Sequence, residues 1–287
     1  MKSLVTAAFL LLVATQSGAE EELSAEKTTG TAPGNAPGAE QEATQESRWR
    51  LGFAFGYGLR TNPLVQSDDI PIVIDIDIGW FGNRFFFDNG DLGFTFADND
   101  RVTVSLVARV NSDRVFFRRT DTRFVSVDAT GMPLSETIQV EVPDRSFATE
   151  LGVEVLADGS WGQLQMTAHH DISGTHEGYE LFVDYGYGWR NQRWYFEPSF
   201  GLSYKSEALN DYYWGVREDE ANPALPAYVA GGGVNAHARL ALSYHVNRHW
   251  TFLLVGEFER LNESAAASPI VDDRNVFGYF AGFGFRF

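Results

Sequence analysis

From Trp49 to the final residue, the sequence is a succession of short stretches in which apolar residues occupy every second position. The first stretch, 49–60, places Leu51, Phe53 and Phe55 on one face of a strand and mainly glycine, alanine and arginine on the other. Alternation with a period of two residues indicates a β-strand whose faces lie in different environments. Because the pattern recurs throughout, we expect an all-β chain built around one large sheet.

Three features favour a closed transmembrane barrel over a soluble sandwich, which also alternates. The polar faces carry charges and glycines at successive positions, as expected for a crowded, wet interior. Connections alternate between tight turns and long loops, which predicts short periplasmic turns and longer extracellular loops. The apolar faces carry aromatic residues towards the strand ends, as in the girdles at the two bilayer interfaces. The tryptophans concerned are Trp49, Trp80, Trp189, Trp194 and Trp250.

Counting these stretches gives a transmembrane antiparallel up-and-down barrel of about twelve strands. An even number places both ends of the barrel in the periplasm. Residues 89–91 form a short link where a long one is due, and the strands beside it are short, so ten strands is the alternative. The expected strands are 49–60, 70–80, 84–88, 92–97, 101–110, 146–157, 160–171, 178–189, 193–205, 228–246, 249–261 and 275–287.

The N-terminal residues differ from the rest of the chain. Residues 1–19 have the form of a secretory signal peptide, with one lysine, an apolar core and small residues ending at Ala19. We expect cleavage after Ala19 and export. Residues 20–47 contain almost no large apolar side chains and many acidic ones, which predicts a disordered acidic periplasmic tether, with a partner-binding arm as the alternative. Residues 48–287 then form the outer-membrane barrel.

Composition excludes several classes of protein. The formal net charge of −17 disfavours binding to nucleic acid. The chain has no cysteine, which excludes disulfides, thiolate metal sites and a cysteine nucleophile. Outside the N-terminus no apolar run approaches the roughly 20 residues that a transmembrane helix needs. We therefore expect neither a helical membrane protein nor a cofactor.

Ionisable residues on the polar faces are expected to line the barrel interior. Because an unpaired buried charge costs several kcal/mol, these residues must pair across strands or line water. Pairing predicts a plugged lumen, whereas an open lumen with this acidic excess would prefer cations. The residues are Asp75, Asp77, Arg101, Arg109, Glu150, Glu154, Glu180, Asp184, Arg190, Arg193, Glu197, Lys205, Arg239, Glu257, Glu259 and Arg286.

No strong catalytic motif is present. His169, His170 and Asp171 end one expected strand and His176 follows the next loop, which resembles a metal cluster or part of a His/Ser site. Alternation directs His169 inward and His170 outward, so the adjacent pair cannot bind one ion without a bulge. We therefore interpret these residues as interface and loop histidines and expect no catalytic and no metal site.

Two long loops carry neighbouring aromatic residues. One contains Phe116 and Phe117, and the other contains Tyr212, Tyr213 and Trp214. Exposed aromatic residues on loops suit adhesion or contact with a partner. The alternative is that these side chains fold over the barrel mouth.

The last strand has Phe283, Phe285 and the final Phe287 at alternate positions. This pattern resembles the C-terminal aromatic signature that the outer-membrane barrel assembly machinery recognises, so we expect that machinery to be a partner. An exposed edge strand of this type would aggregate in a soluble protein.

The final third of the chain carries the most specific motifs. Residues 210–287 contain DYYWGV, PAYVAGGGVNA, GEFERL and AAASPIV before the closing aromatic strand. With these motifs the chain resembles the outer-membrane proteins grouped as MltA-interacting protein and OmpV. The resemblance covers nearly all of 48–287 and is looser in the N-terminal half. The positions carried over as family markers are Tyr212, Tyr213, Gly215, Val216, Tyr228, Ser268 and Pro269.

The resemblance implies a β-barrel of the Gram-negative outer membrane, in contact with its lipid and lipopolysaccharide, and carries no catalytic residue. One branch of the family is a scaffold that links a lytic transglycosylase to a bifunctional penicillin-binding protein in murein synthesis. Other branches are adhesins, osmoregulated proteins or factors in antibiotic uptake. We therefore expect a non-enzymatic scaffold, with a small cation or solute channel and an adhesin as alternatives. A lipid hydrolase is disfavoured, because the sequence shows no convincing pair of nucleophile and base.

Overall fold

The computed structural model describes residues 49–117 and 142–286. The expected signal peptide (1–19), the expected tether (20–47) and Phe287 lie outside the described residues. The helices are the 3-10 helix η1 (Asp113–Phe117), α1 (Glu207–Trp214) and α2 (Glu263–Ala266). The strands are β1 (Trp49–Arg60), β2 (Ile70–Phe81), β3 (Phe85–Asp88), β4 (Asp91–Asp98), β5 (Val102–Val110), β6 (Thr149–Gly159), β7 (Gly162–Asp171), β8 (Tyr179–Gly186), β9 (Trp189–Asn191), β10 (Trp194–Lys205), β11 (Gly233–His245), β12 (Trp250–Arg260) and β13 (Asn275–Arg286).

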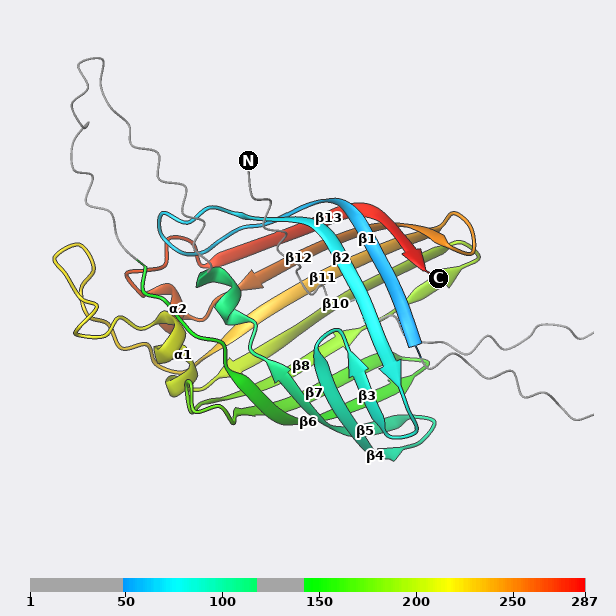
Figure 1. Cartoon of the computed structure of the whole chain (residues 1–287), viewed down its shortest axis with the longest axis horizontal. Coiled ribbons are helices and arrows are strands. Elements are labelled where there is room, and N and C mark those ends of the chain that lie inside the picture. Colours follow the sequence, from blue (N-terminus) through cyan, green and yellow to red (C-terminus); the bar gives the residue numbers. More distant parts are fainter. Residues whose placement is uncertain (1–48, 118–141, 287) are drawn as a thin grey trace, which may run out of the picture.

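The strands form one closed antiparallel ring in which strands adjacent in sequence pair, except that β8 pairs with β10 and not with β9 (Figure 1). The ring closes where β13 pairs with β1, from Gly52 opposite Arg286 to Arg60 opposite Gly278. β8 and β9 lie in line along one barrel strand, because both pair with β10. The barrel therefore has twelve strands, which confirms the larger of the two predicted counts.

Side chains alternate between the outer surface and the interior. Along β1, Phe53 and Phe55 are exposed on the outside, whereas Ala54 is buried inside. Large apolar side chains such as Leu181 and Leu202 continue this exposed surface on β8 and β10. A continuous apolar outer face suits contact with hydrocarbon. In the part of the chain that the structure describes, no helix is long and apolar enough to cross a membrane.

Ile72 departs from the predicted alternation. The sequence pattern groups it with Ile74 on the apolar outer face, but Ile72 is buried in the interior beside Phe280. A bulge causes the difference: Phe55 pairs with Ile74 and then Gly58 pairs with Ile72, so β1 has one more residue than β2 at this point. Such a shift changes which face a residue occupies and cannot be read from the pattern of one strand.

The two ends of the barrel differ. Tight turns join the strands at the end where β1 begins, whereas η1, α1 and α2 gather at the opposite end (Figure 1). In outer-membrane barrels the short turns are periplasmic and the long loops are extracellular. We therefore name the end with tight turns the inner end and the end with helices the outer end.

The β3–β4 hairpin is shorter than its neighbours. β2 pairs with β3 only from Gly79 to Phe81, and the hairpin turns at Asn89 and Gly90. Both turn residues have positive φ, 49° and 107°, as in the tight turns that join two antiparallel strands. The short link predicted at 89–91 is therefore a hairpin turn part of the way up the wall, and the two short strands are real.

Candidate functional site

An apolar cluster closes the outer end of the barrel, and we name it the cap. Tyr213 and Trp214 have no exposed surface, and Phe117 lies against both rings at centroid distances of 6.0 and 5.9 Å. The loop aromatics thus fold over the barrel mouth, and the expectation that they are exposed for adhesion is wrong for these three residues. The buried members of the cap are Leu64, Phe116, Phe117, Leu209, Tyr213, Trp214, Val216, Leu225, Ala230, Leu261, Ala265, Ile270 and Val276.

Local sequence explains how α1 enters the cap. The side chain of Ser206 caps the helix by accepting a hydrogen bond from the backbone N–H of Leu209. Leu209 and Tyr213 are four residues apart, so they lie on the same buried face of the helix. Gly215 ends the helix, where an added Cβ would lie 2.3 Å from the backbone oxygen of Asp211. Glycine is therefore required at this turn into the cap.

Arg145, in the 111–148 connection, joins this connection to the loop that follows α1. Its guanidinium donates to both carboxylate oxygens of Glu220, at 2.7 and 3.0 Å, and to the backbone oxygen of Gly215 at 2.9 Å. Burial would raise the pKa of Glu220, but the hydrogen bonds from Arg145 and from the backbone N–H of Arg217 hold this pKa below its ordinary value. Burial also raises the pKa of Tyr213, which keeps its hydroxyl neutral. The outer loops are thus joined by a charged contact as well as by apolar packing.

The family-marker positions gather in this cap. Ser268 is buried and its hydroxyl donates to the backbone oxygen of Trp214. Tyr228 pairs through its backbone with Val216, and its hydroxyl donates to the backbone oxygen of Ser264 at 2.8 Å. The remaining markers lie in the same region, with Tyr213 and Gly215 buried and Tyr212 and Pro269 partly buried.

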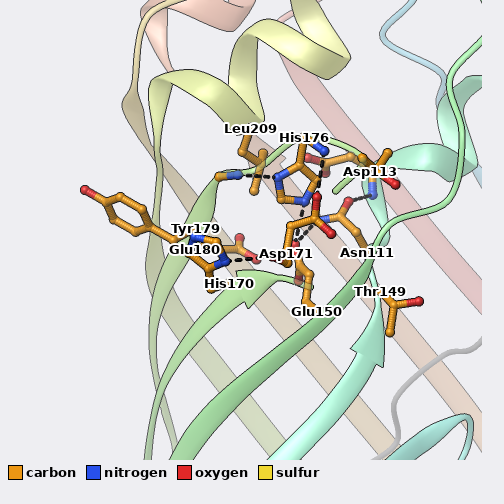
Figure 2. A network of polar contacts seen from close by, with 12 residues as sticks. Asn111, Asp113, Thr149, Glu150, His170, Asp171, His176, Tyr179, Glu180 and Leu209 are labelled. Carbon is orange, nitrogen blue, oxygen red and sulfur yellow. Dashed lines mark hydrogen bonds and ion pairs between the residues drawn. The ribbon is translucent and has the colours of Figure 1, made fainter. Parts of the chain in front are cut away.

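A layer of buried charges lies next to the cap, on the barrel side (Figure 2). Glu150 has no exposed side-chain surface and accepts hydrogen bonds from Arg109 at 2.9 Å, Asn111 at 2.7 Å and His176 at 3.2 Å. Arg109 also donates to Glu180, so one guanidinium joins β5 to β6 and β8. The carboxylates in this layer are satisfied by neighbouring strands, which agrees with the pairing that a plugged lumen requires.

Lys205 and Asp113 extend this layer. The ammonium of Lys205, at the end of β10, lies 2.6 and 2.7 Å from the two carboxylate oxygens of Asp113 in η1. The side chains are only 5% and 6% exposed, so the pair is almost cut off from water. Because η1 leads into the cap, this ion pair ties the cap to the barrel wall.

The contacts of His176 define its role. Its Nδ1 accepts the backbone N–H of Gly178 at 3.0 Å, so the ring proton lies on Nε2 and is donated to Glu150. Asp171 accepts three backbone N–H groups of the following loop at 2.7 to 2.9 Å. Both ring nitrogens of His176 are therefore occupied by contacts that hold the 172–178 loop, and neither is available as a general base.

His169 and His170 point to opposite faces, as alternation predicts. His169 is buried in the interior, whereas His170 is exposed and its Nδ1 lies 2.7 Å from the backbone oxygen of Asp171. Neither ring nitrogen of His169 has a hydrogen-bond partner among the described residues. Within 49–117 and 142–286, no three His, Asp or Glu side chains form a group that could hold a metal ion.

Two cavities lie in the interior towards the inner end. A cavity of about 200 Å³ is lined by residues of β1, β2, β11 and β12, including Asp75, Asp77 and Arg239. A second cavity of about 910 Å³ is lined by residues of β4 to β10, and Tyr195 and Glu197 line both cavities. Both linings include residues of the tight turns, so these cavities face the periplasmic side.

Ion pairs also cross the middle of the barrel. His237 lies 2.9 Å from Asp184. Arg239 lies between Glu197 and Glu257, at N–O distances of 3.8 and 3.5 Å. Arg239 is therefore close to both carboxylates without being tightly bound. Its Nε and one terminal nitrogen have no hydrogen-bond partner among the described residues.

Most of the charges predicted for the lumen face it, with Arg101 and Arg193 as exceptions. Arg101 is exposed in the turn before β5, because the strand begins one residue later than expected. Arg193 is exposed in the turn before β10, and the side chain of Arg286 is not described. Arg190 lies over the ring of Tyr195 at the inner end. The predicted residues with interior contacts or cavity lining are Asp75, Asp77, Arg109, Glu150, Glu154, Glu180, Asp184, Arg190, Glu197, Lys205, Arg239, Glu257 and Glu259.

Sequence reasoning missed other interior charges. Arg50 donates to Asp77 at 2.8 Å and to Asp88 at 2.5 Å. Arg60 contacts Glu259 at 3.2 Å. Arg50 and Arg60 occupy the polar face of the first strand, so alternation could have found them, whereas Asp113 lies in a loop whose path no pattern specifies.

Comparisons with known protein sequences agree with an outer-membrane location. The sequence profile of the family described as MltA-interacting protein MipA matches residues 37–287. Outer membrane protein OmpV of Vibrio cholerae is 27% identical over 233 residues, which cover 81% of this chain and 84% of that protein. The MltA-interacting protein of Escherichia coli is 25% identical over 130 residues, which cover 45% and 52%. Among solved structures, the NanC porin gives a TM-score of 0.44 at 11% identity and covers 83% of this chain and 100% of that one.

Proposed function

Because this outer-membrane chain belongs to the MltA-interacting protein MipA family, we propose that it is a non-enzymatic scaffold that binds murein enzymes at its periplasmic face. The partner in this proposal is a lytic transglycosylase, as the name of the Escherichia coli relative suggests. A penicillin-binding protein is the second enzyme that such a scaffold would hold.

The closed outer end is the observation that carries this proposal. The cap buries Tyr213 and Trp214, and the Lys205–Asp113 pair lies beneath it with almost no access to water. The cavities and the tight turns face the periplasm instead. A barrel with this arrangement offers its accessible surface to periplasmic proteins rather than to solutes outside the cell.

The inner turns suggest where a partner binds. Arg193 and Arg248 are exposed in two turns at the inner end, on a chain whose formal charge is −17. Basic groups at the rim of an otherwise acidic protein attract an acidic partner surface and orient its approach. The proposed contact surface is therefore centred on these turns.

Chemical crosslinking in intact cells, followed by purification of the barrel, tests the proposal. We expect a lytic transglycosylase to be recovered with the unmodified protein and to be strongly reduced with an Arg193→Glu/Arg248→Glu variant. Arg260→Glu, which reverses an exposed charge at the outer end of β12, is the matched control and should leave recovery unchanged. Recovery of no murein enzyme with the unmodified protein would contradict the proposal.

A channel is the second candidate. The cavity of about 910 Å³ and its lining of Asp98, Asp158 and Glu197 favour passage of small cations at the inner end. Conduction also requires the cap to move aside, together with the Lys205–Asp113 pair. Electrical recording separates this candidate from a scaffold.

A further inference from the structure

The barrel wall has an interruption between β2 and β5. The β3–β4 hairpin fills the space between these strands only at the inner end, because β2 pairs with β3 from Gly79 to Phe81 and no further (Figure 1). On the other side of the hairpin, β4 pairs with β5 only as far as Ala108. Among the described residues, the segment of β2 from Ile70 to Asp77 therefore has no strand on its β3 side, and we name this region the lateral break.

The side chain of Asn89 ends the hydrogen-bond ladder between β2 and β3. The backbone N–H of Asn89 donates to the oxygen of Ile78, and the N–H of Ile78 donates to the side-chain oxygen of Asn89, both at 2.9 Å. Because backbone direction alternates along a strand, the N–H groups of Ile76 and Ile74 point to the same side. Neither has a hydrogen-bond partner among residues 49–117 and 142–286. Unpaired backbone groups are costly in hydrocarbon, so this edge requires a polar group or water beside it.

The interior side of the lateral break is acidic. Asp88 and Asp91 face each other across the hairpin turn, and the other charges that act on Asp91 are Arg109 and Glu154. Arg109 is already bound by two other carboxylates of the charged layer, and Asp88 shares Arg50 with Asp77. Asp91 has no ion-pair or hydrogen-bond partner in the described part of the chain. The balance of charge here therefore favours an added cation.

The exterior side of the lateral break is apolar. Ile74 and Ile76 on β2, Leu92 beside the hairpin turn and Val110 at the end of β5 are all exposed on the outer surface. The cavity of about 200 Å³ reaches this region, because Asp75, Ile76, Asp77 and Asn89 belong to its lining. At the lateral break, the interior side therefore favours a cation and the exterior side faces hydrocarbon.

We propose that the lateral break binds a long-chain amine, with the ammonium group beside Asp91 and Glu154 and the alkyl chain passing between β2 and β5 into the bilayer. The ammonium group supplies the missing cation, and the chain covers the apolar exterior. This site is independent of the periplasmic contact proposed above.

A second copy of the chain could meet the lateral break only through a parallel ladder, which is the less stable kind of pairing. Two barrels in one membrane share the same orientation, so a two-fold axis between them runs along the membrane normal. That axis would bring two β2 edges together in parallel, whereas an antiparallel ladder between them would need one barrel to be inverted. An amphiphile meets no such restriction.

The absence of cysteine from the natural sequence makes a direct test available. Leu92→Cys places a thiol at the lateral break, and Leu202→Cys places one on the outer face of β10; the native leucines are 61% and 55% exposed. Each variant is labelled with bimane in nanodiscs, and dodecylamine carrying a nitroxide on its chain is added as quencher. We expect saturable quenching at Leu92→Cys and only the non-saturating quenching of bulk lipid at Leu202→Cys.

Charge variants and competing amphiphiles complete the test. Asp91→Asn combined with Glu154→Gln should weaken the saturable quenching about tenfold, which corresponds to about 1.4 kcal/mol. Asp272→Asn, at an exposed position in an outer loop, should not weaken it. Retained heat-modifiable mobility in gels shows that each variant is folded. Equal quenching at the two positions, equal competition by dodecyl sulfate, or equal competition by butylamine would each overturn the proposal.

Discussion

At the scale of single residues, Lys205 and Asp113 form a buried ion pair in the outer half of the barrel. Their contact at 2.6 Å is nearly inaccessible to water. Lys205→Met would leave the Asp113 carboxylate buried without its cation, so we expect a loss of about 3–5 kcal/mol in the free energy of unfolding. Urea unfolding of the refolded barrel, followed by gel mobility, measures this loss. The double variant Lys205→Met/Asp113→Leu should recover much of it, and a single variant as stable as the natural protein would contradict the ion-pair interpretation.

The contact between Arg145 and Glu220 gives the cap a pH dependence. Because the pKa of Glu220 is lowered in the folded cap, its contribution to stability is complete above the ordinary glutamate value of about 4.3 and is lost as pH falls through the lowered value. Unfolding midpoints between neutral and strongly acidic pH should therefore fall more for the natural protein than for Glu220→Gln. Parallel pH profiles for the two proteins would show that this contact adds no stability.

Residues on strands were easier to predict than residues in loops. Glu150 and Glu180 occupy alternate positions of long strands, so their inward direction follows from the sequence alone. Arg145 and Asp113 lie in connections, and their partners are Glu220 and Lys205, which are distant in sequence. No local pattern brings such residues together, so the links that hold the cap emerge only from the three-dimensional structure.

At the scale of elements, the seam between β1 and β13 depends on close contact of two backbones. A Cβ added at Gly56 would lie 2.2 Å from the backbone oxygen of Ala281, whereas one added at Gly256 on β12 would meet nothing within 4 Å. We expect Gly56→Ala to destabilise the barrel by about 1–3 kcal/mol and Gly256→Ala to have little effect. The fraction of heat-modifiable folded protein after refolding measures both. Equal yields for the two variants would contradict the close approach at Gly56.

The number and order of strands could be predicted because each strand carries its own alternation. The β3–β4 hairpin was identified by its short link, although its consequence for the wall was not, since that depends on the longer strands beside it. The bulge that turns Ile72 inward and the burial of Trp214 also depend on neighbouring segments. Local pattern therefore determines the elements, whereas contacts between distant segments determine register shifts, the cap and the lateral break.

At the scale of the whole molecule, the barrel is asymmetric along its axis. The outer end combines the cap with buried ion pairs, and the inner half contains cavities that face the periplasm. This asymmetry favours a scaffold over an open pore, because an ion crossing the barrel would have to displace packed aromatic side chains. In the described part of the barrel, the lateral break is the place on the apolar outer face where we propose that an amphiphile binds.

Electrical recording of the purified barrel in a planar bilayer tests the closed outer end most directly. We expect no conductance steps for the natural protein at moderate voltage of either sign. A variant in which a short glycine–serine link replaces residues 207–230 removes much of the cap and should give cation-preferring steps. Frequent steps from the natural protein, as large as those of this variant, would contradict the claim that the cap seals the barrel.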